Sequence, residues 1–195
     1  MVEYTTKKSK VHILTCLIII SGVVDFLINF MINFILDVFN FNNNIYSIYL
    51  LFIFIFIGTY NIFYKLFDEY FWNKKYVLDF LNMYDLNGNW EGHTKTSKYK
   101  KDFKVTIKQT WTEIEMNLKT DQSISTLISF SFKKSNEMHD VCYTYYSEVK
   151  QNQNEINSHY GTCCLDIGDN DILTGTYFTD EKRKTYGEIY LKRIK

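Results

Sequence analysis

Proline is absent from the 195-residue sequence, and the formal net charge is zero because 22 basic residues balance 22 acidic ones. Without proline, turns and domain boundaries must be inferred from hydropathy and periodicity. The balanced charge excludes the strong overall field by which many proteins attract DNA, RNA or anionic lipid, and we expect no nucleic-acid polymer as a partner. An anionic ligand must therefore be bound at a local site.

Cysteine is scarce, and its spacing fits no metal site. Cys16 lies in an apolar run, Cys142 stands alone, and Cys163 and Cys164 are adjacent, so the sequence contains no C-x-x-C pair. We therefore expect reduced, structural thiols rather than a disulfide framework or a zinc site.

Signatures of catalysis are lacking as well. The sequence has no glycine-rich phosphate loop, no nucleophile elbow and no pair of carboxylates that can be placed together. The histidines show no metal-ligand spacing: His12, His93, His139 and His159. These features favour a binding module without a metal or cofactor over an enzyme.

Two long apolar runs occupy the first third of the chain. Residues 11–36 read VHILTCLIIISGVVDFLINFMINFIL, and residues 45–67 read IYSIYLLFIFIFIGTYNIFYKLF. Each run is long enough to cross a hydrocarbon core of about 30 Å as a tilted helix. A signal peptide is disfavoured because the first run is too long and no A-x-A-like cleavage site follows it. We expect residues 1–67 to form a transmembrane helical hairpin.

Lysines lie at the outer ends of both runs, and the connecting turn has no basic residue. They are Lys7, Lys8 and Lys10 before the first run, with Lys65, Lys74 and Lys75 at or beyond the end of the second. Because lysine and arginine flank membrane spans on the cytoplasmic side, both termini are expected to be cytoplasmic.

A polar stripe follows the first apolar run. Ser21, Asp25, Asn29 and Asn33 recur at intervals of four, which places them on one slowly winding face of a helix. A carboxylate near mid-span costs about 2.5 to 3.5 kcal/mol on insertion scales, so this face should avoid lipid. Its partner is either the second helix of the same chain or a helix of another protomer, in which case the stripe lines a polar space within an assembly.

The hydrophobic period changes from 3.6 to 2 at residue 87. Residues 68–86 are loosely amphipathic and predict a juxtamembrane helix that ends near Asn87 and Gly88. Residues 87–195 contain eight candidate strands: 88–95, 103–110, 112–120, 123–133, 138–146, 157–167, 171–179 and 184–193. Eight short strands, each with one apolar face, favour a small antiparallel up-and-down β-barrel, since closure removes both sheet edges. A two-sheet sandwich is the alternative.

The first candidate strand carries Gly88 and Trp90. This pair resembles the Gly-x-Trp of lipocalin-like barrels, in which the indole closes one end and a basic residue of the last strand packs over it. Arg193 stands at the corresponding place in the last candidate strand. We expect Trp90 to be a structural plug, with a cation–π contact to Arg193 of about 0.5 to 2 kcal/mol.

Up-and-down connectivity brings the loops after the first, third, fifth and seventh strands to the end opposite the plug. Hydroxyls, rings and one arginine meet there: Thr120, Ser123, Ser125, Tyr143, Tyr145, His159, Tyr160, Tyr177, Thr179, Arg183 and Thr185. Rings that stack and an arginine that forks onto phosphate suit a ligand of bases, sugars and phosphates. Serine, threonine and tyrosine are also ordinary strand and turn residues, so composition alone does not separate a binding site from a plain barrel end.

The order of these features resembles the bacterial antiphage (CBASS) effectors that have two transmembrane helices and a β-strand-rich sensor of cyclic oligonucleotides. The resemblance rests on the hairpin followed by LNGNWEG, VTIKQTWTEIEMNLKTDQSISTL, YTYY, HYGTCCLDI and LTGTYFTDEKRKTYGEIYLKR. It implies that a nucleotidyltransferase activated during infection makes a 3′,3′-cyclic dinucleotide, which the barrel binds. It further implies that the membrane segments of several chains then associate and damage the bacterial inner membrane. It also implies ligand contacts at Thr120, Ser123, Ser125, Tyr177, Thr179, Arg183 and Thr185, with Lys182 and Lys184 as alternatives to Arg183.

Two other functions are compatible with the sequence. A membrane-tethered lipocalin-like barrel that binds a lipid or another apolar ligand needs an empty apolar interior, whereas bulky residues such as Phe103, Ile107 and Met116 are expected to fill it. A scaffold subunit whose barrel binds a protein is the second alternative.

Overall fold

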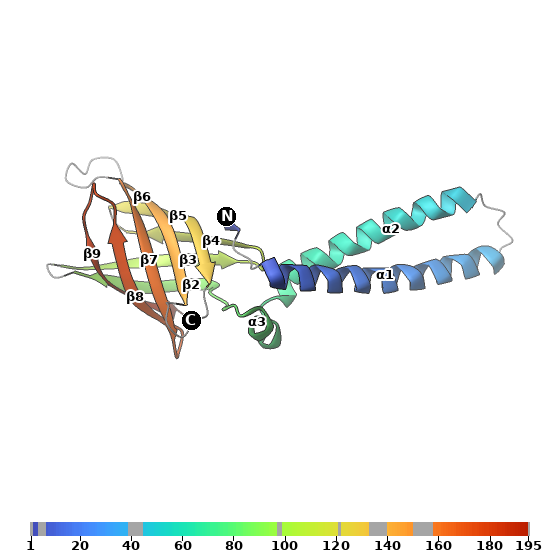
Figure 1. Cartoon of the computed structure of the whole chain (residues 1–195), viewed down its shortest axis with the longest axis horizontal. Helices are drawn as coiled ribbons and strands as arrows, with labels where there is room; N and C mark the ends of the chain where they lie inside the picture. The colour runs from blue at the N-terminus through green and yellow to red at the C-terminus, as the bar shows by residue number, and fades with distance from the viewer. Residues whose placement is uncertain are drawn as a thin grey trace. The chain divides into compact units, whose positions relative to one another are not determined.

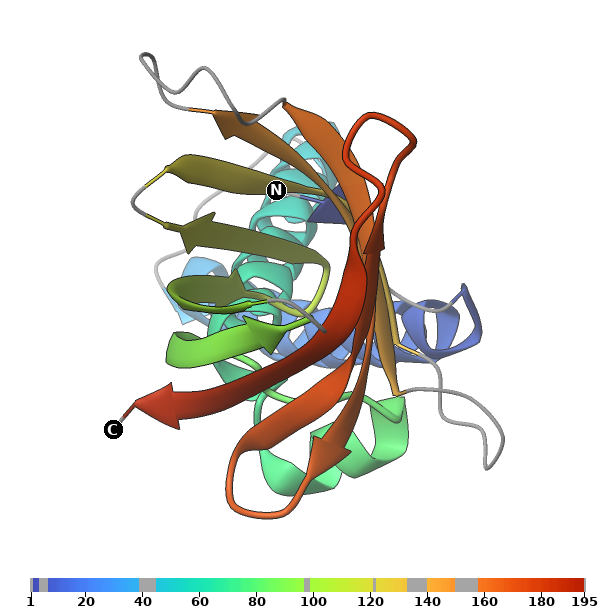
Figure 2. The ribbon, with the colours of Figure 1, turned by 90° about the vertical axis from the view of Figure 1, so that its left-hand side faces the viewer.

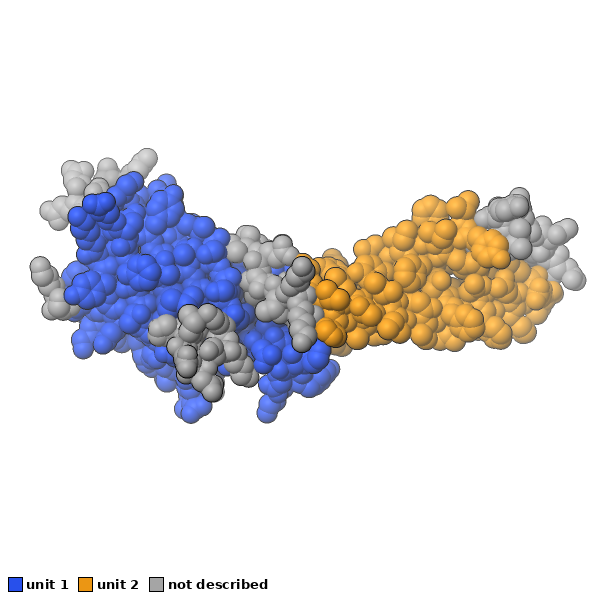
Figure 3. Space-filling model, viewed as in Figure 1, with its two compact units in different colours: residues 1–4, 75–195 blue, residues 5–74 orange. Residues whose placement is uncertain are grey.

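The structure is a computed structural model that describes residues 2–3, 7–38, 45–96, 99–120, 122–132, 140–149 and 158–194. The chain divides into two compact units, coloured separately in Figure 3. One unit contains residues 5–74, and the other contains residues 1–4 and 75–195.

The first unit contains two long helices. α1 runs from Lys7–Val38, α2 from Ile45–Leu66, and α2 continues into the short π-helix η1, Phe67–Phe71 (Figure 1). The stretches Lys10–Val38 and Tyr49–Phe71 are long and apolar enough to span a membrane. The predicted pair of long apolar helices is confirmed.

The polar stripe of α1 makes hydrogen bonds along its own helix. Ser21 is buried, and its Oγ donates to the carbonyl oxygen of Leu17 at 2.7 Å. Further along, Asn33 Nδ2 donates to Asn29 Oδ1 at 2.5 Å. Oδ1 of Asp25 is buried and has no hydrogen-bond partner among the described residues. This oxygen of Asp25 can therefore still accept a hydrogen bond.

The second unit contains a helix, α3, that is shorter than the expected juxtamembrane helix. α3 spans Lys75–Leu81 and does not extend to Asn87. Asn82 ends it by adopting a φ of 52°, and the amide of Met83 then donates to the carbonyl oxygen of Leu78 at 3.0 Å. This hydrogen bond is typical of the Schellman motif, in which the residue after the last helical turn adopts a left-handed backbone conformation. Asparagine occupies that position here, where glycine is more usual.

Eight antiparallel strands of this unit close into a barrel (Figures 1 and 2). They are β2 (Gly88–Lys95), β3 (Lys100–Gln109), β4 (Glu113–Lys119), β5 (Ser123–Phe132), β6 (Val141–Val149), β7 (His159–Gly168), β8 (Ile172–Thr179) and β9 (Tyr186–Ile194). Each strand pairs with the next in sequence, and β9 pairs with β2 to complete the circle. The up-and-down barrel is confirmed, and the sandwich alternative is wrong.

The seam between β4 and β5 is short. Only three residue pairs join these strands, from Asn117–Thr126 to Lys119–Ile124. At the other end of β4, the two-residue strand β1, Val2–Glu3, pairs with Ile114 and Glu113. The sequence analysis did not anticipate β1, which adds the beginning of the chain to the barrel sheet.

Inward side chains fill the barrel from its closed end, where β2 begins. On β3 the alternate residues Phe103, Val105, Ile107 and Gln109 are buried, as expected for a strand with one inward face. Gln109 is held by the chain that precedes the barrel, since its Oε1 accepts from the amide of Leu86 at 2.8 Å. Packing is therefore continuous from this segment into the barrel core.

Trp90 and Arg193 meet at the closed end. The indole is only 1% exposed, and its Nε1 donates to the carbonyl oxygen of Leu86 at 2.9 Å. The guanidinium carbon of Arg193 lies 4.8 Å from the centroid of the indole ring. Arg193 also donates to the carbonyl oxygen of Asp85 and lies 3.4 Å from Asp171 Oδ1. The contact between the two side chains is present, whereas their predicted role in stabilising the closed end of the barrel stays a prediction.

One expectation about cysteine is wrong. Cys142 of β6 and Cys164 of β7 form a disulfide, although we expected only reduced thiols. The two residues are direct cross-strand partners in the β6–β7 register, which places their side chains on the same face. Cys16 and Cys163 are free.

Candidate functional site: a polar cavity at the open end of the barrel

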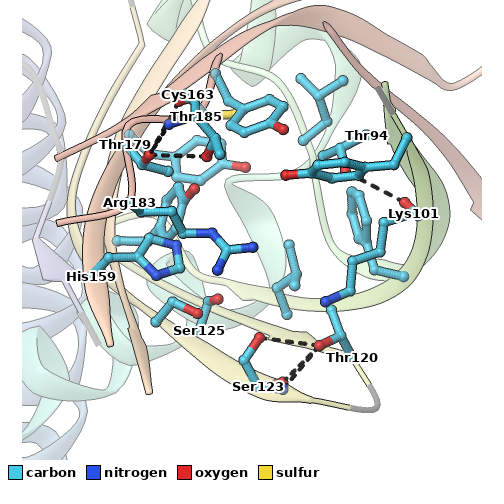
Figure 4. A pocket seen from close by; sticks show the side chains of 18 residues that line it. Thr94, Lys101, Thr120, Ser123, Ser125, His159, Cys163, Thr179, Arg183 and Thr185 are labelled. Carbon is cyan, nitrogen blue, oxygen red and sulfur yellow. Dashed lines mark hydrogen bonds between the residues drawn. The ribbon is translucent and has the colours of Figure 1, made fainter. Parts of the chain in front are cut away.

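A cavity opens at the end of the barrel opposite Trp90 (Figure 4). It is lined by Thr94, Tyr99, Lys101, Phe103, Leu118, Thr120, Ser123, Ser125, Tyr143, Tyr145, Ser147, His159, Cys163, Tyr177, Thr179, Arg183, Thr185 and Ile189. This set includes all seven ligand contacts that the resemblance implies, together with Tyr143 and Tyr145, which were also predicted to bind the ligand at the barrel mouth. The structure thus brings them together, and their contact with a ligand stays a prediction.

Two turns at the rim carry pairs of hydroxyl groups. At the β4–β5 turn, Thr120 Oγ1 and Ser123 Oγ are 3.1 Å apart. At the β8–β9 turn, Thr179 Oγ1 and Thr185 Oγ1 are 3.0 Å apart. Figure 4 shows the two pairs on different walls of the cavity.

Two basic side chains line the cavity. Arg183 belongs to the β8–β9 turn, where its amide donates to the carbonyl oxygen of Asp180 at 3.1 Å. Lys101 of β3 faces it from another wall in Figure 4, and its Nζ donates to Gln122 Oε1 at 2.8 Å. Lys182 and Lys184 are exposed and do not line the cavity. Of these three neighbouring cations, Arg183 is therefore the one placed to contact a molecule in the cavity.

The buried phenols of the cavity are neutral at physiological pH. Burial raises the pKa of Tyr143 well above its ordinary value, and the neighbouring Cys163 adds to the shift. Burial likewise raises the pKa of Tyr145 and of Tyr177, although Arg183 opposes both shifts. These side chains therefore keep their protons and offer O–H donors and ring faces to a ligand.

Cys163 lies among these rings as an inert thiol. It is only 1% exposed, and burial raises its pKa to about 12, while a hydrogen bond with Tyr143 acts in the opposite direction. Because the thiolate is the nucleophilic form, this side chain is a packing residue rather than a reactive one.

The cavity is small. Its volume is about 90 Å³ with the side chains as they stand. Sites that hold small organic molecules usually measure roughly 300 to 1,000 Å³. The side chains as they stand therefore leave less room than such a molecule needs.

Comparison with known proteins identifies the barrel. Residues 81–193, more than half of the chain, match the family described as Cap15, cyclic dinucleotide receptor domain. The chain belongs to the Cap15 family.

Two relatives carry the name CD-NTase-associated protein 15. The protein from Yersinia aleksiciae is 29% identical over 145 residues, which cover 70% of this chain and 68% of the relative. The protein from Staphylococcus schleiferi is 28% identical over 135 residues, which cover 66% of this chain and 71% of the relative. Cap15 proteins are CBASS effectors with a receptor domain and not a known catalytic domain.

Sequence reasoning missed several residues that line the cavity of this Cap15 domain. Lys101 shares the inward face of β3 with Phe103, and Thr94 shares the inward face of β2 with Trp90. Their even spacing from buried aromatic residues is a signal that could have found them. Conversely, Tyr160 was expected at the mouth but is 54% exposed on the outer surface, because it alternates with the inward His159.

Among the described residues, no group of three or more acidic, histidine or cysteine side chains could hold a metal ion. Of the four histidines, His159 lines the cavity, whereas His139 lies outside the described residues. His93 belongs to β2, where its ring stacks on Tyr190 at 5.4 Å between centroids.

Proposed function

We propose that the barrel of this chain binds a 3′,3′-cyclic dinucleotide and that binding drives association of the membrane helices, which disrupts the bacterial inner membrane during antiphage defence. The observation that carries the proposal is the cavity, which gathers two cations, hydroxyl pairs and neutral tyrosines inside a Cap15 receptor domain. A nucleotidyltransferase of the CD-NTase class is the expected source of the ligand, in keeping with the name of the relatives.

The chemistry of the cavity fits the parts of such a ligand. Arginine forks onto phosphate oxygens, and lysine supplies a second positive charge. Tyr143, Tyr145 and Tyr177 supply rings that can stack on bases, typically worth about 1 to 3 kcal/mol each. Hydroxyls that both donate and accept can read base edges or sugar oxygens.

The membrane output needs only a difference in affinity. A ligand that binds assembled chains more tightly than isolated ones shifts the population toward assemblies. Confinement to a membrane raises the local concentration of chains and favours the same shift. Asp25 supports a role for the α1 stripe, since its buried Oδ1 has no hydrogen-bond partner in the described part of one chain. We propose that a second copy of the chain supplies a hydrogen-bond donor to this oxygen. We also propose that both termini of each chain lie in the cytoplasm.

The stripe can be tested separately from the receptor. We expect the double variant Asp25→Leu, Asn29→Leu to bind the ligand with unchanged affinity and to lose toxicity when the defence system is triggered. The matched control is Asn61→Leu in α2, whose side chain bonds to the carbonyl oxygen of Ile57 in its own helix. Persistent toxicity of the double variant at equal expression would remove the stripe from the mechanism.

Lipid binding is the main rival. The deeper part of the barrel is filled by large apolar side chains, which leaves little room for an acyl chain, and the remaining cavity adds hydroxyls and two cations to its apolar lining. A scaffold role, in which the barrel binds a protein, gives no use to Lys101 and Arg183, which line the cavity.

The deciding experiment is isothermal titration of the full chain in detergent micelles. The titrants are 3′,3′-cyclic dinucleotides that carry adenine, guanine or uracil, with linear dinucleotides and fatty acids as controls. Saturable binding of one cyclic species supports the proposal. If no cyclic dinucleotide binds a chain that retains the circular dichroism of a folded barrel, the receptor function is wrong, and uptake of fatty acid would favour the rival.

A further inference from the structure

The two hydroxyl pairs at the rim share one hydrogen-bonding pattern. The amide of Ser123 donates to Thr120 Oγ1 at 3.0 Å, and the amide of Thr185 donates to Thr179 Oγ1 at 2.8 Å. Each threonine hydroxyl also bonds back to the carbonyl oxygen of its partner residue, at 3.3 Å and 3.1 Å respectively. In both turns the threonine amide donates to that same carbonyl oxygen.

Loop length does not explain this likeness. Thr120 and Ser123 are three positions apart, whereas Thr179 and Thr185 are six apart. The turns at Thr96–Tyr99 and Thr110–Glu113 close with a threonine as well, but the second residue of each has no short hydroxyl side chain. Tyr99 of the β2–β3 turn also lines the cavity, but among the described residues of these turns the pairs of short hydroxyl side chains are those of the β4–β5 and β8–β9 turns.

The two turns lie on opposite sides of the barrel. Going round the circle, four strands (β5 to β8) separate them on one side, and four strands (β9, β2, β3 and β4) separate them on the other. A cation accompanies each turn. Arg183 belongs to the β8–β9 turn, and Lys101 is held at the β4–β5 turn by its hydrogen bond to Gln122. Figure 4 shows the two groups facing each other across the cavity.

We infer that the cavity is built with approximate twofold symmetry, and that each half takes one phosphate of a cyclic dinucleotide. This inference rests on the proposed function and assigns Lys101 as the second phosphate contact. One phosphate lies against Arg183 and the Thr179–Thr185 pair, and the other lies against Lys101 and the Thr120–Ser123 pair. A cyclic dinucleotide presents its two phosphates on opposite sides of one ring, so it satisfies both halves at once. A ligand with a single phosphate satisfies only one.

The halves are not equivalent, and this has a measurable consequence. Arginine offers a planar fork and lysine a point charge, so two chemically identical phosphates become different once bound. A symmetric ligand should therefore give two separate ³¹P signals in the complex. Each signal should respond to the cation on its own side.

The test uses the full chain in detergent micelles and whichever adenine, guanine or uracil 3′,3′-cyclic homodinucleotide binds the wild type. We expect Lys101→Met and Arg183→Met each to weaken binding by roughly 10- to 100-fold, the usual effect of losing one charge-assisted hydrogen bond. Lys182→Met and Lys184→Met are the matched controls and should change affinity by less than about 2-fold, because their side chains are exposed. At saturating ligand, Lys101→Met should move one ³¹P signal and Arg183→Met the other.

The outcomes separate this inference from the receptor function itself. If the wild type binds but Lys101→Met behaves like the controls, or if both variants move the same ³¹P signal, the two-half arrangement is wrong and the receptor function stands. If no cyclic dinucleotide binds the folded wild type, the proposed function fails first. A melting temperature close to that of the wild type shows that a weakened variant is still folded.

Discussion

Arg193 offers the sharpest test of how the barrel is held closed, through the variant Arg193→Met. Methionine keeps an unbranched apolar stem, so packing of the side chain is largely preserved while the guanidinium is removed. Three contacts are lost together: the cation over Trp90, the hydrogen bond to the carbonyl oxygen of Asp85, and the ion pair with Asp171.

The magnitude follows from the exposure of each contact. The cation–π contact is worth roughly 1 to 2 kcal/mol for a largely desolvated pair, and a charged hydrogen bond roughly 1.5 to 3 kcal/mol. The ion pair adds little, because the Asp171 side chain is 48% exposed. Against this, Nε of Arg193 is buried without a partner among the described residues, so its removal recovers roughly 1 kcal/mol or more. The net loss is about 1 to 3 kcal/mol, which corresponds to a fall of roughly 5 to 15 °C in melting temperature for a domain of this size.

The assay is thermal unfolding of the full chain in detergent micelles, followed by near-ultraviolet circular dichroism of the aromatic residues. Lys192→Met is the control, because Lys192 is the preceding residue of β9 and is exposed on the outer face. It should shift the midpoint by no more than a degree or two, since exposed substitutions usually cost less than about 0.5 kcal/mol. Equal midpoints for Arg193→Met and the wild type would refute the reasoning that this arginine stabilises the closed end.

Two further predictions concern the wall of the barrel. Gly175→Ala should prevent folding or lower the melting temperature severely, because a Cβ at this position would overlap the carbonyl oxygen of Cys164. Gly168→Ala is the control and should fold normally, because its Cβ would lie 3.5 Å from the carbonyl oxygen of Ile172, an ordinary van der Waals contact. Stability should also fall above about pH 9, since the unfolded chain then releases the Cys163 proton while the folded chain, with a pKa of about 12, retains it. At pH 10 this loss is on the order of 1 kcal/mol. Cys163→Ala should flatten the decline of the melting temperature between pH 8 and pH 10.5, and an unchanged slope would contradict the assignment.

The sequence allowed the barrel to be predicted because alternation is a local property. Each strand shows its inward face through residues two apart, such as Val105 and Ile107, and Gly88 with Trp90 mark where the first strand begins. Up-and-down connectivity then determines which loops share an end. That is why the hydroxyls of the β4–β5 and β8–β9 turns could be grouped before their positions were known.

Other features depend on register or on distant geometry. The Cys142–Cys164 pairing requires the alignment of β6 with β7, which no local pattern specifies. β1 has only two residues, too few for any periodicity, and it pairs where β5 has diverged from β4. Lys101 was missed because its strand was expected to start at residue 103, and Lys182 and Lys184 could not be separated from Arg183 without the shape of the turn.

The short strand β1 gives the barrel a second covalent connection to the rest of the chain, in addition to the segment that precedes β2. β1 joins β4 at its first residues, Glu113 and Ile114, and β2 begins at Gly88, so both connections leave the barrel at the closed end. The residues that line the cavity at the opposite end include none of β1 and none of the segment that precedes β2. In the proposed function, the effect of a bound ligand on the helices therefore has to pass along the barrel strands. Variants of the cavity and variants of the two connections should then impair ligand binding and membrane damage separately.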